Sequence, residues 1–172
     1  EVDSPVGILP PSMRELRHRL LFRDRIVGVA RAGHRAIGRA LSPAAFAALE
    51  HVVIMPNTTN TFGEAVDVAL EAQGLERNRR FVTPNYITAS HLLEKTDMVA
   101  LLPLSLASRF RDRFGLAELA LPVDVPEFEV HISWHDRTHR HAAHIWFRDQ
   151  VMQSLDPRQQ GIDMLREDTF IR

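Results

Sequence analysis

The sequence predicts an α/β fold with a mostly parallel sheet. Short apolar strands alternate along the chain with amphipathic helices of about 8 to 12 residues, a pattern typical of βαβ crossovers. The segment Met98–Leu102 (MVALL) is apolar without alternation, which predicts a strand buried on both faces. With 172 residues, 45% of them hydrophobic, the chain can form one domain or two small lobes around a buried core.

The first strand and helix follow from local residue preferences. Asp24–Arg31 (DRIVGVAR) is rich in β-branched residues and is followed by Ala-Gly, which predicts a strand. Ser42 and Pro43 then predict a helix start, because serine caps a helix and proline in the first turn loses no hydrogen bond. His51–Met55 (HVVIM) is a second apolar strand.

A longer helix is predicted from Phe62 to Gln73. Phe62, Val66, Ala69 and Leu70 recur on one helical face, and Gly74 stands where a left-handed C-cap belongs.

The same alternation continues to the end of the chain. It predicts strands at Arg80–Thr83, Leu116–Leu121 and Phe128–Trp134, and helices at Tyr86–Lys95, Ser105–Phe114 (ended by Gly115) and His139–Leu155. The residues from Asp156 onward are polar with scattered apolar positions, and we expect them to be poorly ordered.

Composition excludes several classes of protein. Lys and Arg total 21 against 22 Asp and Glu, so the chain lacks the cationic surplus of a nucleic-acid-binding module. Cysteine is absent, which excludes disulfides, thiolate metal sites and thiol nucleophiles. No apolar run approaches the roughly 18 residues of a membrane span, and the first residues (EVDSPVG) lack a signal-peptide pattern. These features favour a cytoplasmic protein.

Four histidines, His135, His139, His141 and His144, lie close together and suggest a metal site. Their spacing argues against one, because His139 and His141 lie about 200° apart on a helix and no HExxH motif is present. The alternative is a strand-to-helix junction with solvated histidines. We therefore expect neither a metal nor another cofactor.

Two other patterns suggest a possible catalytic or binding site. Ser105, His91 and Asp97 are residue types of a nucleophilic triad, but no G-x-S-x-G turn exposes the serine. The loop Asn57–Thr61 (NTTNT) leaves two interpretations open. Thr61 with Glu64 matches a T-x-x-E capping box, and the same helix start could also bind an anion.

Several segments, taken in order, resemble the effector-binding domain of LysR-type transcriptional regulators. Leu20–His34 (LLFRDRIVGVARAGH) resembles the L-F-x-D-x-L-V-x-V-x-R-x-x-H-P stretch of that family, and Thr96–Pro103 (TDMVALLP) resembles x-D-L-V-A-x-L-P. Phe81–Tyr86 (FVTPNY) is similar to V-P-H-F, and Trp134–Arg148 is similar to W-H-x-R…D-P-A-H-x-W-L-R. The common order extends over Glu1–Val151.

The resemblance implies a two-lobed fold like that of the type 2 periplasmic binding proteins, with the effector in the interlobe cleft. The implied division is residues 23–125 as one complete lobe, residues 1–22 and 126–155 as part of the other, and residues 156–172 as a C-terminal tail. The match starts well inside the regulatory domain, so we expect the first lobe to be incomplete. Apolar residues left uncovered there (Val6, Ile8, Leu9 and Ile132) predict a dimer or larger homo-oligomer.

The branch of the family that senses salicylate-like and nitroaromatic compounds bears the closest resemblance. Four cleft positions of that branch imply an effector site at Asp24, Thr61, Phe62, Gly63, Ser105 and Val130. Ser105 stands where the branch carries Arg and Asp24 adds negative charge, so a simple aromatic carboxylate would lack its bidentate partner. The alternative is that Phe62 and Val130 are ordinary core residues and Asp24 is a surface charge.

The sequence therefore indicates the effector-sensing domain of a bacterial transcriptional regulator and not an enzyme. It would bind a small aromatic molecule and form a homo-oligomer. It would reach DNA only through a winged helix-turn-helix domain absent from these 172 residues, and no membrane partner is expected. The alternative is a stand-alone solute-binding protein of the same fold.

Overall fold

The chain divides into two compact units, which we call unit 1 (residues 1–24 and 127–172) and unit 2 (residues 25–126). The computed structural model describes residues 4–8, 16–55 and 63–155. The predicted tail from Asp156 onward lies outside the described residues.

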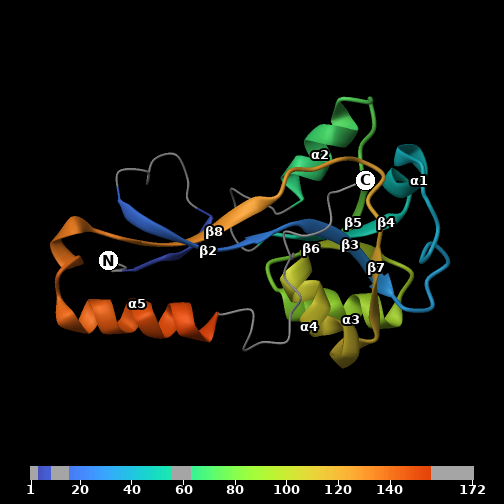
Figure 1. Ribbon diagram of the computed structural model, residues 1–172. Helices are drawn as coiled ribbons and strands as arrows, with labels where there is room; N and C mark the ends of the chain where they lie inside the picture. The colour runs from blue at the N-terminus through green and yellow to red at the C-terminus, as the bar shows by residue number, and fades with distance from the viewer. Residues whose placement is uncertain (1–3, 9–15, 56–62, 156–172) are drawn as a thin grey trace, which may run out of the picture. The chain divides into compact units, whose positions relative to one another are not determined.

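Unit 2 is built on a five-stranded sheet. Its strands are β3 (Ile26–Arg31), β4 (Glu50–Ile54), β5 (Asn78–Thr83), β6 (Val99–Pro103) and β7 (Leu116–Leu119). Their order across the sheet is β5-β4-β6-β3-β7 (Figure 1). β4 pairs in parallel with β5 and β6, whereas β3 lies antiparallel between β6 and β7. All strands except β3 therefore point in one direction, as the sequence predicts for this part of the chain.

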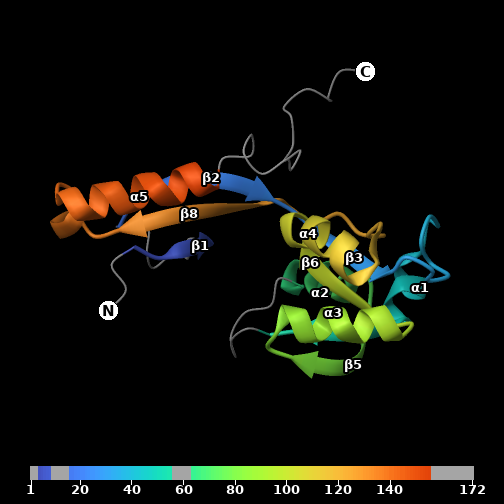
Figure 2. The same cartoon turned by 90° about the horizontal axis from the view of Figure 1, so that it is seen from below.

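The four helices that the structure describes in unit 2 cover both faces of this sheet. They are α1 (Pro43–Ala47), α2 (Glu64–Glu71), α3 (Tyr86–Lys95) and α4 (Leu104–Phe114). α3 and α4 lie on one face, and α1 and α2 lie on the other (Figure 1, Figure 2). Every residue of β6 is buried, which confirms the prediction from its uninterrupted apolar run.

The helix ends confirm three predictions from the sequence. The Ser42 hydroxyl caps α1 by accepting a hydrogen bond from the Ala45 N–H at 3.2 Å. Gly74 follows α2 with φ +70°, and the N–H of Leu75 donates to the Leu70 carbonyl at 3.0 Å, the closing bond of a Schellman motif. Gly115 ends α4 in the left-handed region, with φ +61°.

Unit 1 contains a smaller, antiparallel sheet. Its strands are β1 (Val6–Ile8), β2 (Arg17–Asp24) and β8 (Phe128–Trp134), in the order β1-β8-β2. The expectation of mostly parallel sheets does not hold here, because β8 runs opposite to both of its neighbours. The residue pattern predicts a strand from Asp24 onward but did not predict the part of β2 that precedes Asp24, since most of its side chains are exposed and do not alternate.

The helix α5 (Ala142–Ser154) completes unit 1 and lies along this sheet (Figure 2). A short 3-10 helix at Asp136–Thr138 precedes it, so α5 begins three residues later than the sequence predicts. None of the helices in the described residues is long and apolar enough to cross a membrane.

The apolar residues predicted to lie uncovered in unit 1 have three different outcomes. Val6 and Ile8 are 48% and 46% exposed. Ile132 is fully buried, so its prediction is wrong: its side chain belongs to the core of unit 1. Leu9 lies outside the described residues.

His51 is a fully buried polar residue in β4. Its Nε2–H donates to the Phe46 carbonyl at 2.9 Å, and its ring lies edge-on to the Phe46 ring. Burial is the main cause that lowers the pKa of His51 from 6.5 to about 4. The imidazole is therefore neutral in the folded protein at pH 7.

Acid should destabilise the protein through His51. The unfolded chain binds a proton to this residue below its ordinary pKa of 6.5, while the folded protein does so only near pH 4. His51 therefore contributes fully to the free energy of unfolding above pH 6.5. This contribution is lost as the pH falls toward 4, at about 1.4 kcal/mol per pH unit. Urea unfolding at pH 7 and pH 5 should show a smaller pH difference for His51→Gln than for the wild type. Equal pH dependence in both proteins would contradict the assignment.

Candidate functional site

Three helix N-termini gather at one edge of the unit 2 sheet. β4, β5 and β6 are parallel neighbours, so their carboxyl ends lie at the same edge, and α2, α3 and α4 follow them in the chain. Open α/β sheets bind ligands beyond this edge of their strands. We call it the carboxyl edge.

A side chain caps the start of α3, and one backbone hydrogen bond holds the start of α4. Asn85 caps α3, where its Oδ1 accepts hydrogen bonds from the N–H groups of Ile87 at 2.8 Å and Thr88 at 3.2 Å. At α4 the Leu104 N–H donates to the carbonyl of Arg25 at 2.9 Å. Because β3 is antiparallel, its amino end reaches the carboxyl edge and supplies this carbonyl.

The start of α2 is held by a buried ion pair. Gly63 is the N-cap residue and makes no side-chain cap. Behind it, Arg77 binds Asp67 in a bidentate manner, with Nε–Oδ1 2.6 Å and Nη2–Oδ2 2.7 Å. The Arg77 side chain is only 2% exposed, and Arg79 adds a second contact to Asp67 at 3.3 Å.

A small cavity of about 10 Å³ lies beside this ion pair. Gly63, Arg77, Leu101 and Tyr86 are among its lining residues. Burial raises the pKa of Tyr86 to about 12, so its phenol stays protonated. The volume suffices for about one water molecule and is too small for an organic ligand.

The predicted site residues fall on both units. Gly63 and Ser105 lie at the carboxyl edge of unit 2, at the starts of α2 and α4. Thr61 and Phe62 lie outside the described residues. In unit 1, Val130 pairs with Phe22 and Phe128 pairs with Asp24, which places Asp24 and Val130 on one face of the small sheet.

The exposure of these residues tests part of the alternative interpretation, in which Asp24 is a surface charge and Phe62 and Val130 are ordinary core residues. Asp24 is 4% exposed, so it is not a surface charge. Val130 and Ser105 are half-buried. The ion pair of Asp67 and Arg77, which sequence reasoning missed, joins residues ten positions apart across the turn at Gly74.

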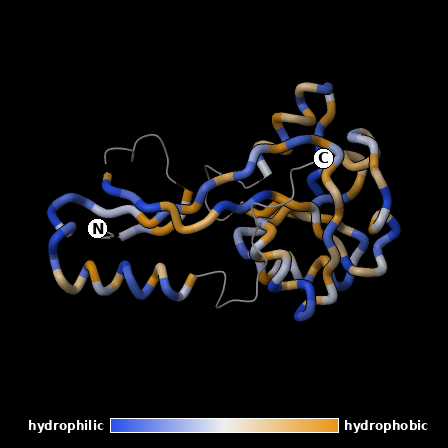
Figure 3. The backbone as a smooth tube through the Cα atoms, viewed as in Figure 1, coloured by the Kyte–Doolittle hydropathy of each residue, from blue (hydrophilic) through white to orange (hydrophobic). Residues whose placement is uncertain are grey.

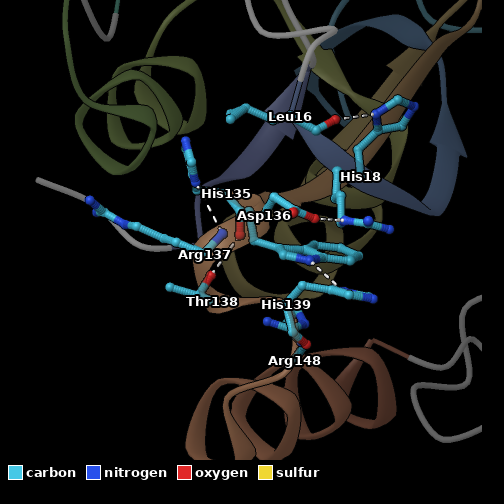
Figure 4. Close-up of polar contacts among 10 residues, drawn as sticks. Leu16, His18, His135, Asp136, Arg137, Thr138, His139 and Arg148 are labelled. Atoms are coloured by element: carbon cyan, nitrogen blue, oxygen red, sulfur yellow. Dashed lines mark hydrogen bonds and ion pairs between the residues drawn. The ribbon is translucent and has the colours of Figure 1, made fainter.

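The clustered histidines make different structural contacts (Figure 4). His135 Nδ1 accepts a hydrogen bond from the Arg137 N–H at 3.1 Å, and His139 Nδ1 accepts one from the Trp134 indole at 3.2 Å. The rings of His141 and His144 meet edge-to-face at 5.1 Å. Within residues 4–8, 16–55 and 63–155, no group of three or more His, Asp or Glu side chains could hold a metal.

The nucleophilic triad is also excluded by geometry. Asp97 pairs with Arg31 at 2.6 Å, and the His91 ring lies edge-on to Phe114 at 5.0 Å. Phe114 ends α4 while Ser105 lies in its first turn, about 13 Å away at 1.5 Å per residue. These side chains therefore cannot act together as a nucleophile, base and acid.

Comparison with known proteins identifies the class to which this architecture belongs. The family described as LysR substrate binding domain matches residues 1–156. The regulatory domain of MexT, a transcriptional activator in Pseudomonas aeruginosa, has the same fold, with a TM-score of 0.74, 20% identity and coverage of 88% of this chain and 74% of the other. The two-lobed fold of the periplasmic-binding-protein type is thereby confirmed.

The chain belongs to the LysR substrate-binding domain family. It is 33% identical over 147 residues to the transcriptional activator NagR of a Ralstonia species, covering 86% of this chain and 48% of NagR. It is also 33% identical over 151 residues to the transcriptional regulator SyrM of Rhizobium meliloti, covering 88% of this chain and 46% of SyrM. The chain thus spans about half the length of these relatives, which are transcriptional regulators and not enzymes.

Gly63→Ala should destabilise the protein. A Cβ at this position would lie 2.8 Å from Nη2 of Arg77 and 2.9 Å from Cδ1 of Leu101. Because Asp67 holds Arg77 in place, we expect a loss of about 1 to 3 kcal/mol in the free energy of unfolding. Gly7→Ala is the control, since nothing lies within 4 Å of its added Cβ. Equal losses of stability by urea unfolding in the two variants would contradict the tight contact.

Proposed function

We propose that this chain is the effector-sensing domain of a bacterial LysR-type transcriptional regulator. The family match over residues 1–156 supports this proposal most directly. The relatives named above are regulators, and nothing in the comparisons favours a stand-alone solute-binding protein. In this proposal the chain is not an enzyme and acts in the cytoplasm.

The effector would contact the carboxyl edge of unit 2 through Gly63 and Ser105. Thr61 and Phe62, which directly precede Gly63, would contribute as well. The support is the gathering of three helix starts at this edge, where α4 has no side-chain cap among the described residues. Backbone N–H groups at helix starts favour oxygen atoms of a ligand.

Asp24 and Val130, which lie on one face of the sheet of unit 1, are the remaining proposed effector contacts. A buried carboxylate accepts hydrogen bonds and repels anions, so Asp24 favours a ligand with a hydroxyl donor. Arg77 is engaged by Asp67 through Nε and Nη2 and is therefore committed to holding α2. We infer that the effector is a small aromatic molecule with a hydroxyl group, and that a carboxylate is not required.

The complete regulator would be a homo-oligomer that binds DNA through a winged helix-turn-helix domain outside these 172 residues. The exposure of Val6 and Ile8 in unit 1, and of Trp146 on α5, supports further packing of this unit.

Asp24→Asn and Ser105→Ala should each reduce effector binding by the full-length regulator. Ligands that bind only the folded protein raise its melting temperature, so phenol and catechol can be screened by thermal shift. We expect catechol to stabilise the wild type and to lose about tenfold or more in affinity with each variant, which is the effect of one lost hydrogen bond in a desolvated site.

Ser154→Ala is the control for this experiment, because Ser154 is exposed at the end of α5. Circular dichroism checks that each variant is folded. If both folded variants retain the catechol shift of the wild type, this placement of the site is wrong.

A further inference from the structure

The helix α5 is attached to the sheet of unit 1 without an apolar face of its own. Arg148 is its single buried residue, and hydrophobic and hydrophilic residues are mixed along the helix (Figure 3). Its consecutive apolar residues Ile145, Trp146 and Phe147 are all exposed. A hollow of about 380 Å³ lies between α5 and the strands β2 and β8. The attachment of α5 to the sheet therefore depends mainly on Arg148.

Arg148 is held by two groups that lie outside α5. Its Cζ lies 4.5 Å from the centre of the Trp134 ring on β8, which is a cation–π contact. Its Nη2 donates to the His139 carbonyl at 3.0 Å (Figure 4). His139 lies in the segment between β8 and α5, so the helix is joined to the strand both directly and through this residue.

The side chain of His139 also contacts Trp134. Its Nδ1 accepts a hydrogen bond from the indole N–H at 3.2 Å, and the two rings are nearly parallel, with 11° between their planes. An indole N–H can only donate, so Nδ1 must carry a lone pair while this bond exists. Trp134, His139 and Arg148 thus form a closed set of contacts between β8 and α5, which we call the latch.

A proton on Nδ1 of His139 is incompatible with the latch. It would turn the acceptor into a donor and place two N–H groups against each other. Histidine is the side chain whose charge ordinarily changes between about pH 5 and 8. The hydrogen bond to Trp134 is therefore made at the upper end of this range, where the imidazole is neutral, and is lost toward the lower end.

The charged groups around His139 are mostly positive. They come from β2, from the segment after β8 and from α5: Arg17, Arg19, His135, Asp136, Arg137, Arg140, His141, His144, Arg148 and Asp149. The hydrogen bond from Arg17 lowers the pKa of Asp136, so this carboxylate stays charged between pH 5 and 8 and is not the group that titrates. A proton on His139 would add positive charge beside the guanidinium that the latch holds.

We propose that the latch is a pH-sensitive switch within unit 1, in which protonation of His139 breaks its hydrogen bond with Trp134 and releases α5 from β8. The neutral form keeps Arg148 buried and Trp134 covered, at 9% exposed. The protonated form uncovers this side of the small sheet. None of the three latch residues is among the proposed effector contacts, so the inference does not rest on the proposed function.

The accessibility of Trp134 reports the state of the latch. Trp146→Phe removes a 65% exposed indole and leaves Trp134 as the single tryptophan of the 172-residue chain. In this parent protein the bimolecular constant for fluorescence quenching by acrylamide should increase about twofold or more from pH 7.5 to pH 5.5. This range stays above the pKa of about 4 of His51. An unchanged quenching constant would overturn the proposal.

Two substitutions of His139 separate the acceptor from the proton. Glutamine carries an oxygen acceptor that does not titrate, so His139→Gln should keep Trp134 protected at both pH values. Leucine offers no acceptor, so His139→Leu should leave Trp134 accessible at both. The proposal is wrong if His139→Gln retains the pH dependence of the parent, or if Trp134 in folded His139→Leu is as protected as in the parent at pH 7.5.

The neighbouring histidines supply the controls. His135 accepts its hydrogen bond from the Arg137 N–H, and the His144 ring contacts His141, so neither holds the indole. His135→Gln and His144→Gln should both retain the pH-dependent increase, and its loss in either would assign the switch to another histidine. Circular dichroism at both pH values checks that each variant is folded. If His139→Leu does not fold, the comparison of the parent with His139→Gln decides the outcome.

Discussion

The antiparallel position of β3 determines where the polar groups of unit 2 lie. β3 enters the sheet between β6 and β7, so its first residues lie at the edge where β4, β5 and β6 end. The Arg25 carbonyl there accepts the N–H of Leu104 and joins the start of α4 to the start of β3. The carboxyl edge is thus defined by backbone pairing before any side chain contributes.

The buried ion pair behind Gly63 adds a second constraint. A buried pair gains little net stability, because desolvation offsets most of the attraction, but loss of one partner leaves a charge without compensation. Asp67 and Arg77 therefore fix α2 relative to the segment that leads into β5. The neutral His51 in β4 is consistent with this arrangement, since the nearby positive charge of Arg77 also lowers its pKa.

Local patterns predicted most of unit 2 because each element there is decided by burial and caps. The helix Tyr86–Lys95 has the predicted bounds, and Gly74 and Gly115 have the predicted left-handed backbone. The part of β2 that precedes Asp24 was missed because its residues are mostly exposed and because it is fixed by pairing with β8, a partner more than 100 positions away. The ion pair of Asp67 and Arg77 was missed for a similar reason, since no local pattern requires it.

The residues of the candidate site also divide into those that a local sequence pattern predicted and those that it did not. The sequence placed Gly63 and Ser105 at strand-to-helix junctions, and parallel pairing of β4 with β6 puts these junctions at one edge. The histidines between Trp134 and α5 drew attention to a metal, yet two of them accept hydrogen bonds within this segment, from the Arg137 N–H and from the Trp134 indole. The spacing of the histidines in the sequence does not reveal these partners.

The residues proposed as effector contacts favour a neutral ligand over an anion. The resemblance to regulators that sense salicylate-like compounds implies an arginine at the position of Ser105, so this chain offers a hydroxyl there in place of a guanidinium. Asp24 is 4% exposed, and a buried carboxylate repels an anion. The buried guanidinium of Arg77 beside Gly63 is engaged by both oxygens of Asp67. If the proposed contacts are correct, charge therefore argues for an aromatic ligand with a hydroxyl group and against a simple carboxylate.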